Sequence, residues 1–414
     1  MHIIVPVATV GKLITSPFKK RSVVFLHQNY YHFYYLAKAL RARGWDAVLV
    51  SLESANSPHA NFYHGDDINL FSDDHVEFRR SIREFFAHAK KRFRLLHFSG
   101  AGQMSFFPEN WKWETDDSWD IVDWKTSGRR VAYTTTGCND GVAQSSVMKW
   151  SSTGEAGNVC QKCPWQPDPA ICNDSKNLGW GRKIERNCDA FFTEGYPALD
   201  YQMGAKTVRE PTTMCLDSAF WRPDLPVPNE FKIIRQPGEL LVYHGVGNYE
   251  ARTQNGRNIK GTPAVIEAIE RLKADGIPVR LVFVTGIKST EVRFIQVQCD
   301  VIVDQLNYGR FGSTAQEGMM LGKPTVCYIN PNEPSQDDVL AYMRELPLIS
   351  ATEQTIYQVL KKLLLMDPEE RSSISRASRL YALKWHSAEA CAARYEQIYD
   401  QLMRGEKVQY PQSW

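Results

Sequence analysis

Short apolar runs alternate with amphipathic stretches along most of the chain, and this alternation constrains the fold more than any other feature. Residues 22–26 (SVVFL) and 46–51 (DAVLVS) are typical of buried strands. The segment between them places Leu36 and Leu40 on one helical face and ends at Gly44, as expected of a helix. A strand–helix–strand unit of this length builds a parallel sheet, so the pattern predicts an α/β protein.

A proline-rich segment separates two such alternating series. It contains four prolines and no apolar period, which is typical of an interdomain linker. The second series has strand-like runs in LLVYHG, VRLVFVTG, CDVIVDQ and PTVCYI. Because 414 residues are too many for one core, we expect two doubly wound Rossmann-like domains that face a cleft. The expected ranges are 1–220 for the N-terminal domain, 221–238 for the linker, 239–385 for the C-terminal domain and 386–414 for C-terminal helices that return to the first domain.

Composition excludes several classes of protein. A hydrophobic content of 43% with 23% charged residues is globular, and a net charge of +2 gives no general attraction to nucleic acid or anionic membrane. No apolar run is long enough to cross a bilayer. The opening MHIIVPVATVG lacks a basic region before it, which favours a first strand over a signal peptide. We therefore expect a cytoplasmic protein, in solution or at the inner face of the membrane, with reduced cysteines.

The stretch NYGRFGSTAQEGMMLGKPTVCYI carries the most specific functional signal. Gly309 and Gly312 allow the backbone to approach a ligand closely. Ser313 and Thr314 can cap the helix that follows, whose first N–H groups would face an anion. Glu317 lies about one turn into that helix, where a carboxylate can accept hydrogen bonds from a ribose diol. The alternative is a glycine-punctuated helix with a merely solvated glutamate.

This stretch resembles the signature of GT-B fold glycosyltransferases, especially the retaining branch known as family four. In that family the glycine-rich turn holds the donor diphosphate, and the second acid of a pair binds the nucleotide ribose. Glu317 matches the second acid, whereas Gly309 stands where the first is usual, with GRFG in place of EGFG. This departure leaves the sugar contact and the donor identity open, and it adds Arg310 to the candidate donor contacts.

Two further segments match the donor side of the same family. RNIKGTPAVIEAI resembles the beginning of the second domain's first helix, where Arg257 and Lys260 would neutralise the diphosphate. Fixed cations stabilise the charge on a departing nucleoside diphosphate, although a solvated basic loop is the alternative for Arg257. VFVTGIKSTE occupies the place where the family contacts the base. The resemblance thus implies a donor site of Arg257, Lys260, Thr285, Gly286, Ile287, Arg310, Gly312, Ser313, Thr314 and Glu317.

The first half of the chain matches the family at two places. RLLHFSG resembles the strand ending in a histidine that contacts the donor sugar, and His97 is the matching residue. The implied catalytic residues are therefore His97, Lys260 and Glu317. HQNYYHF follows the first strand, where the family's acceptor loop lies, although tyrosines beside a helix start often only pack. The implied acceptor-binding residues are His27, Asn29, Tyr30 and His32.

The resemblance implies transfer of a sugar from a UDP-, GDP- or TDP-linked donor to a glycan or glycolipid hydroxyl, with retention, in polysaccharide or glycoconjugate biosynthesis. No catalytic divalent ion is expected, since a helix N-terminus and cations stabilise the leaving group. One alternative is an iron–sulfur dinucleotide oxidoreductase, although HGVGNYE lacks the third glycine of the dinucleotide fingerprint. The other is a non-catalytic sugar-nucleotide-binding protein, because Gly309 replaces an acid.

Five of the nine cysteines gather in a loop-rich insertion at about residues 138–188. Thiolates that bind a metal can replace the core that such a loop cannot build. Structural zinc usually takes two CxxC pairs. A single CxxC with two cysteines at unequal spacing favours a [4Fe–4S] cluster over zinc, and disulfides or free thiols remain as a third option. The predicted ligands are Cys138, Cys160, Cys163 and Cys172, with Cys188 as a substitute.

Overall fold

The computed structural model describes residues 21–100, 104–115, 118–135, 137, 141–151, 159–166, 168–193, 200, 207–209, 214–330 and 341–408. The described residues divide by their contacts into two units. Unit 1 contains those within 1–143, 174–215 and 391–412, and unit 2 contains those within 144–173 and 216–390. The boundary after Cys215 lies close to the predicted domain end at 220, while 221–238, predicted as a linker, belong to unit 2.

Unit 1 is built on a parallel sheet of seven strands among the described residues, in the order β3-β2-β1-β4-β5-β6-β7. The central strands are buried along their whole length. This explains their continuous apolar runs, because helices cover both faces of such a sheet. The strands are β1 (Ser22–Leu26), β2 (Asp46–Ser51), β3 (Ile68–Asn69), β4 (Leu95–Ser99), β5 (Arg130–Thr134), β6 (Ala190–Thr193) and β7 (Thr207–Arg209).

The helices of unit 1 follow the amphipathic stretches of the sequence. In α3 (His75–Arg92) the side chains of Ile82, Phe85, Phe86 and Ala89 are buried at helical spacing, and Asp74 caps the first turn. The other helices are α2 (His32–Ala42), α4 (Trp119–Thr126), α6 (Asp174–Asn187) and α14 (Ala388–Arg404), with short 3-10 turns at Pro58–Phe62 and Pro108–Asn110.

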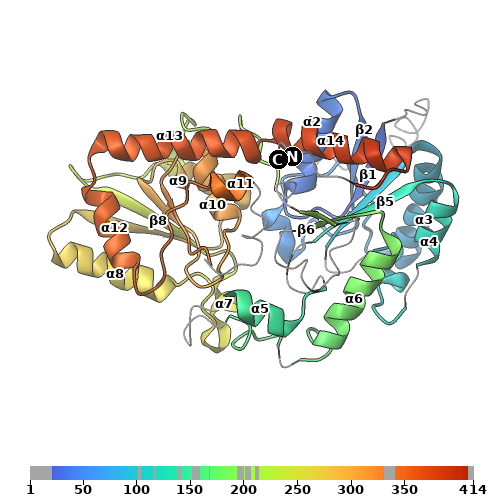
Figure 1. Cartoon of the computed structure of the whole chain (residues 1–414), viewed down its shortest axis with the longest axis horizontal. Helices are drawn as coiled ribbons and strands as arrows, with labels where there is room; N and C mark the ends of the chain where they lie inside the picture. The colour runs from blue at the N-terminus through green and yellow to red at the C-terminus, as the bar shows by residue number, and fades with distance from the viewer. Residues whose placement is uncertain are drawn as a thin grey trace. The chain divides into compact units, whose positions relative to one another are not determined.

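From Cys391 onward, the C-terminal helix α14 packs on unit 1 (Figure 1). Its Glu396 accepts hydrogen bonds from Trp45 Nε1 at 3.0 Å and from Arg21 at 2.7 Å, and it also pairs with Arg43. Burial alone raises the pKa of Glu396, but hydrogen bonds from Trp45 and Arg43 and the nearby positive charges outweigh it and hold the pKa below its ordinary value. Of the residues predicted to return to the first domain, those from Cys391 onward in α14 belong to unit 1, while 386–390 belong to unit 2.

Unit 2 has a four-stranded parallel sheet in the described residues, in the order β11-β10-β8-β9. The chain leaves β8 toward β9 on one side and reaches β10 on the other, so the winding direction reverses between β8 and β10. The strands are β8 (Leu240–Gly245), β9 (Val279–Val284), β10 (Val301–Val303) and β11 (Thr325–Val326). The helices are α5 (Gln144–Ser151), α7 (Tyr249–Thr253), α8 (Thr262–Ala274), α9 (Ser289–Gln296), α10 (Ser313–Met320), α11 (Ala341–Arg344), α12 (Ile356–Leu365) and α13 (Pro368–Trp385), with 3-10 turns at Asn229–Phe231 and Gln254–Gly256.

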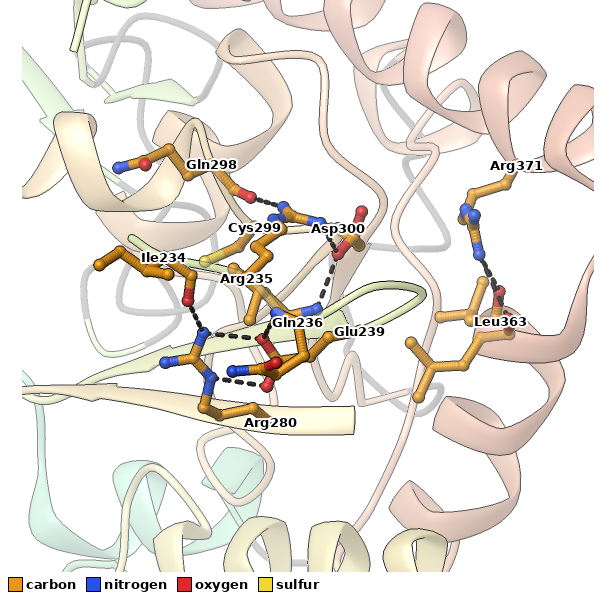
Figure 2. Close-up of polar contacts among 12 residues, drawn as sticks. Ile234, Arg235, Gln236, Glu239, Arg280, Gln298, Cys299, Asp300, Leu363 and Arg371 are labelled. Atoms are coloured by element: carbon orange, nitrogen blue, oxygen red, sulfur yellow. Dashed lines mark hydrogen bonds and ion pairs between the residues drawn. The ribbon is translucent and has the colours of Figure 1, made fainter. Parts of the chain in front are cut away.

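Ion pairs close the amino-terminal edge of this second sheet (Figure 2). Asp300, just before β10, pairs with Arg235 at 2.9 Å and accepts the backbone N–H of Leu241 at 2.7 Å. Arg280 of β9 pairs with Glu239 at 2.8 Å. These contacts fasten the proline-rich segment to unit 2. Within the described residues, no helix has both the length and the apolar character needed to cross a membrane.

Replacing Glu396 with Gln should lower the free energy of unfolding by about 2 kcal/mol near pH 7, because charge-assisted hydrogen bonds are lost. The folded-state pKa of Glu396 is depressed, so its contribution is present above the ordinary glutamate pKa of 4.5 and is lost as the pH falls through the folded-state value. Denaturant unfolding at pH 7 and pH 4 measures this difference. Glu406→Gln is the control, since its pair with Arg404 is solvent-exposed and should contribute little.

Candidate functional site

The carboxyl-terminal edge of the unit 2 sheet is the place where a doubly wound fold binds a ligand. Such ligands lie outside the strand ends where the winding direction reverses, here between β8 and β10. The loop that leads into α8 and the start of α10 belong to this edge, because Lys260 of the first and Gly312 of the second both bond to Asp304, the residue that follows β10.

Asp304 is the centre of this site. Its side chain is fully buried; one carboxylate oxygen pairs with Lys260 Nζ, and the other accepts the backbone N–H of Gly312 at 2.7 Å. One buried carboxylate thus joins the loop before α8 to the first turn of α10. The sequence analysis missed Asp304, although an acid directly after the apolar run of CDVIVDQ was a usable signal.

His244 lies beside this pair near the end of β8 and is fully buried. Its Nδ1 lies 3.2 Å from the carbonyl oxygen of Val303, to which the Nδ1–H donates, and its Nε2 lies 2.9 Å from Thr262 Oγ1. Burial, with the charge of Lys260 adding to it, lowers the pKa of His244 to about 4. The ring is therefore neutral at pH 7 and orients Thr262, the first residue of α8.

The start of α10 differs from its prediction. Its N-cap is Gly312, and Ser313 and Thr314 are the first two helical residues, with no side-chain capping bond. The predicted capping by Ser313 or Thr314 is therefore wrong. A side-chain oxygen caps a helix from the residue that precedes it, and here that residue is a glycine. The N–H groups of Ser313 and Thr314, the first two helical residues, consequently receive no capping bond from the side chain of the N-cap residue, which leaves them suited to an anion.

Glu317 lies inside unit 2, with only 7% of its surface exposed. One of its carboxylate oxygens accepts a hydrogen bond from Gln296 Nε2 at 2.9 Å. Burial raises the pKa of Tyr243 on β8 well above its usual range, and the negative charge of Glu317 adds to this effect. The carboxylate therefore lies near β8 and the end of α9, and its predicted contact with a ribose stays a prediction.

The remaining donor-side candidates surround the same strand ends. Arg257 is half-buried, and its guanidinium carbon lies 5.9 Å from the ring centre of the exposed Trp165, which comes from the cysteine-rich insertion. Arg310 is largely buried, one residue after Gly309, whose φ is +83°. The three residues that follow β9 differ in exposure: Thr285 and Gly286 are exposed, while Ile287 packs against a small apolar cluster of unit 2.

Two of the predicted histidines are interior residues of unit 1. His97 is the third residue of β4 rather than its last, and its ring nitrogens lie 2.5 Å from Tyr399 Oη and 2.8 Å from Thr134 Oγ1. His32 accepts the backbone N–H of Cys215 at 2.8 Å, and burial lowers its pKa to about 3. Both rings are fully buried and engaged within the unit, so direct contact of either histidine with a sugar is not supported.

The other acceptor-side residues form an unusual turn directly after β1. His27, Asn29 and Tyr30 all have positive φ, at 70°, 45° and 56°. Few non-glycine residues adopt this conformation, and such strain gathers at functional sites. The turn passes into α2 through a hydrogen bond from the His32 N–H to the Asn29 carbonyl at 3.0 Å, and it leaves the Tyr30 side chain 40% exposed.

The described residues of the cysteine-rich insertion do not group into the predicted metal site. In the part of the chain that the structure describes, no three His, Cys, Asp or Glu side chains are grouped as metal ligands, so neither the [4Fe–4S] cluster nor zinc is supported. Cys160 and Cys163 form a turn, and Cys172 Sγ accepts a hydrogen bond from Gln144 at 3.4 Å. Cys188 belongs to the apolar core of unit 1, and Cys138 lies outside the described residues.

Comparison with known proteins shows the fold. No protein-family model and no curated protein sequence matches the chain. The structure is similar to sucrose-phosphate synthase from Thermosynechococcus elongatus, with 16% identity, a TM-score of 0.56 and coverage of 93% of this chain and 100% of that one. It is also similar to a glycosyltransferase from Rickettsia africae, with 11% identity, a TM-score of 0.53 and coverage of 94% of this chain and 100% of that one. The catalytic domain of starch synthase IV from Arabidopsis thaliana is similar as well, with 11% identity, a TM-score of 0.55 and coverage of 93% of this chain and 99% of that one. The chain therefore has the predicted GT-B fold.

The loop before α8 tests how tightly the site is built. Gly261 has a φ of +71°, and a Cβ there would lie 2.7 Å from Leu306 Cβ. Gly276 has a φ of +78° but no atom within 4 Å of such a Cβ, so Gly276→Ala reports backbone strain alone. We expect Gly261→Ala to lower the free energy of unfolding by about 2 kcal/mol more than Gly276→Ala, through overpacking. Equal losses in denaturant unfolding would mean that the loop does not depend on this close approach.

Proposed function

We propose that the protein is a glycosyltransferase that moves a sugar from a nucleotide-sugar donor to an acceptor hydroxyl. The observation that carries this proposal is the pair of contacts that Asp304 makes at the strand ends of unit 2, one with Lys260 Nζ and one with the N–H of Gly312, the N-cap of α10. The GT-B fold adds support, because the starch synthase domain of the same fold was solved bound to ADP and acarbose. A nucleoside diphosphate fits a site that offers an ammonium group and helix N–H groups.

The same groups suit the chemistry of the transfer. When the bond between sugar and diphosphate breaks, negative charge grows on the leaving diphosphate, and pre-positioned cations and N–H groups stabilise it. Lys260 has three N–H donors, of which the pair with Asp304 engages at least one. We propose that the remaining donors, the start of α10 and Arg257 bind the diphosphate without a catalytic metal ion. A UDP-, GDP- or TDP-linked donor and retention at the anomeric carbon remain expectations from the resemblance to family four.

The acceptor is proposed to bind at the turn after β1 in unit 1. This turn offers the exposed Tyr30 ring and the polar groups of His27 and Asn29 in strained backbone conformations. An aromatic ring beside hydrogen-bonding side chains suits a sugar, which has an apolar face and hydroxyl groups. The proposed acceptor is a glycan or glycolipid hydroxyl, and the proposed location is the cytoplasm or the inner face of the membrane.

The alternatives have different support. An oxidoreductase would need a helix after HGVG to receive a pyrophosphate, but α7 is only five residues long. A non-catalytic sugar-nucleotide-binding protein is the second candidate, because Gly309 replaces an acid and its φ of +83° suits glycine. Formation of a glycoside product from a panel of nucleotide sugars separates this candidate from a transferase.

A thermal-shift screen with UDP, GDP, ADP and TDP tests the proposed donor site. We expect one of them to stabilise the protein selectively, by about 2.7 kcal/mol at a concentration of 100 Kd. Lys260→Met should remove most of this stabilisation, because the diphosphate loses its buried cation. Lys273→Met is the matched control, since Lys273 is exposed at the far end of α8 and pairs with Glu270. If none of the four nucleotides stabilises the wild-type protein, the proposed function fails.

A further inference from the structure

Asp304 is an unexpected residue in an anion-binding site, because a carboxylate repels a phosphate. It is nevertheless fully buried, and both of its oxygens are engaged, one with Lys260 Nζ and one with the Gly312 N–H. A buried charge of this kind is costly unless it is paired and hydrogen-bonded. The burial and the two contacts of Asp304 therefore indicate that its carboxylate has a role that a neutral side chain could not fill.

We propose that Asp304 is the positioning residue of the donor site, which sets the ammonium group of Lys260 and the first turn of α10 in register for one diphosphate. This inference rests on the proposed function and adds a residue that acts through Lys260 and Gly312 rather than on the substrate. The two elements come from different strand–helix units, and the side chain of Asp304 bonds to both. One side chain therefore contacts both the cation and the residue that begins the helix.

The backbone around Lys260 is fixed independently, which leaves its side chain as the part that Asp304 must hold. Asn307 follows closely after Asp304; its N–H bonds to the Ile259 carbonyl at 3.2 Å, and its Nδ2 bonds to the Asn258 carbonyl at 2.6 Å. Asn307 Nδ2 also donates to Glu353 at 2.8 Å. These hydrogen bonds hold the two residues that precede Lys260 to the segment that follows Asp304.

The pair with Asp304 does not prevent Lys260 from binding a ligand. An ammonium group has three donors, and two remain for phosphate oxygens if Asp304 takes one. Asp304 itself has no exposed surface, so a phosphate at this edge meets the ammonium group and the helix N–H groups instead of the carboxylate. Without Asp304, Lys260 would be a buried cation with a flexible four-carbon stem and no fixed direction.

Asp304→Asn tests this role directly, because the amide has the same shape but only one oxygen. Asn can accept from Lys260 or from the Gly312 N–H, and its NH₂ group then faces the other donor. We expect the Kd for the nucleoside diphosphate found in the thermal-shift screen to rise by about 10- to 100-fold, the value of one or two charge-assisted hydrogen bonds. Isothermal titration calorimetry with that nucleotide measures the change.

Asp300→Asn is the matched control, at the opposite end of the same strand. Asp300 pairs with Arg235 and accepts the Leu241 N–H at the amino-terminal edge of the sheet (Figure 2). Asp300→Asn should lower stability and leave the Kd for the nucleotide unchanged. A positioning role also predicts non-additivity: Asp304→Asn combined with Lys260→Met should weaken binding by less than the sum of the two single losses, because the part of the effect that acts through Lys260 is already lost. Additive losses would show that Asp304 only maintains the fold.

A second variant keeps the test decisive if Asp304→Asn does not fold. Lys260→Met with Asp304→Leu replaces the whole ion pair by apolar side chains, which buried pairs often tolerate. It should fold and bind the nucleotide no more tightly than Lys260→Met. Wild-type affinity in Asp304→Asn would overturn the positioning role while the donor site stands, and wild-type affinity in the double variant would overturn the role of Lys260 as well. Absence of nucleotide binding by the wild-type protein would instead overturn the proposed function.

Discussion

The buried pair of Asp304 and Lys260 is the interaction on which the arrangement of unit 2's strand ends depends. Removing two charges from water costs several kcal/mol, and only good geometry with further hydrogen bonds offsets this cost. Here the second carboxylate oxygen accepts the Gly312 N–H, and the neutral His244 ring packs nearby without adding a charge. The result joins β10, α8 and α10 at the point where the winding direction reverses. A doubly wound sheet places its ligands at this point for the same topological reason.

In unit 1 too, buried polar side chains are satisfied by hydrogen bonds, but there the buried groups are uncharged. His32 and His97 are neutral because burial depresses the pKa of both rings, and each is bonded to a tyrosine of α14, Tyr395 or Tyr399. These bonds attach the C-terminal helix α14 to the start of α2 and to β4. Their role in packing also explains why a histidine in RLLHFSG is a weak signal of catalysis: a satisfied interior histidine has the same sequence pattern.

The sequence predicted the fold well because alternation of buried strands and helices is a local property. It also located the two segments that meet at Asp304, since glycines and a basic residue before a helix mark them. It missed Asp304 because an acid after a strand resembles an ordinary loop residue until its partners are known. Ser313 and Thr314 were misjudged as caps because helix boundaries shift by a residue. The cysteine ligand set is not supported among the described residues, because spacing along the sequence does not establish that thiols meet in space; the substitute ligand Cys188 lies in the core of unit 1.

The departure from the family pattern at Gly309 has a structural consequence for the donor sugar. Gly309 has a φ of +83°, and its carbonyl accepts the Asn330 N–H at 2.8 Å, so an acidic side chain there would add backbone strain. The same segment does carry a carboxylate five residues earlier, at Asp304, but both of its oxygens are engaged and buried. It therefore cannot take over a contact with sugar hydroxyls. In a transferase built this way, groups other than these two residues must bind the hydroxyls of the donor sugar. The largely buried Arg310, which directly follows Gly309 in the sequence, is the nearest candidate.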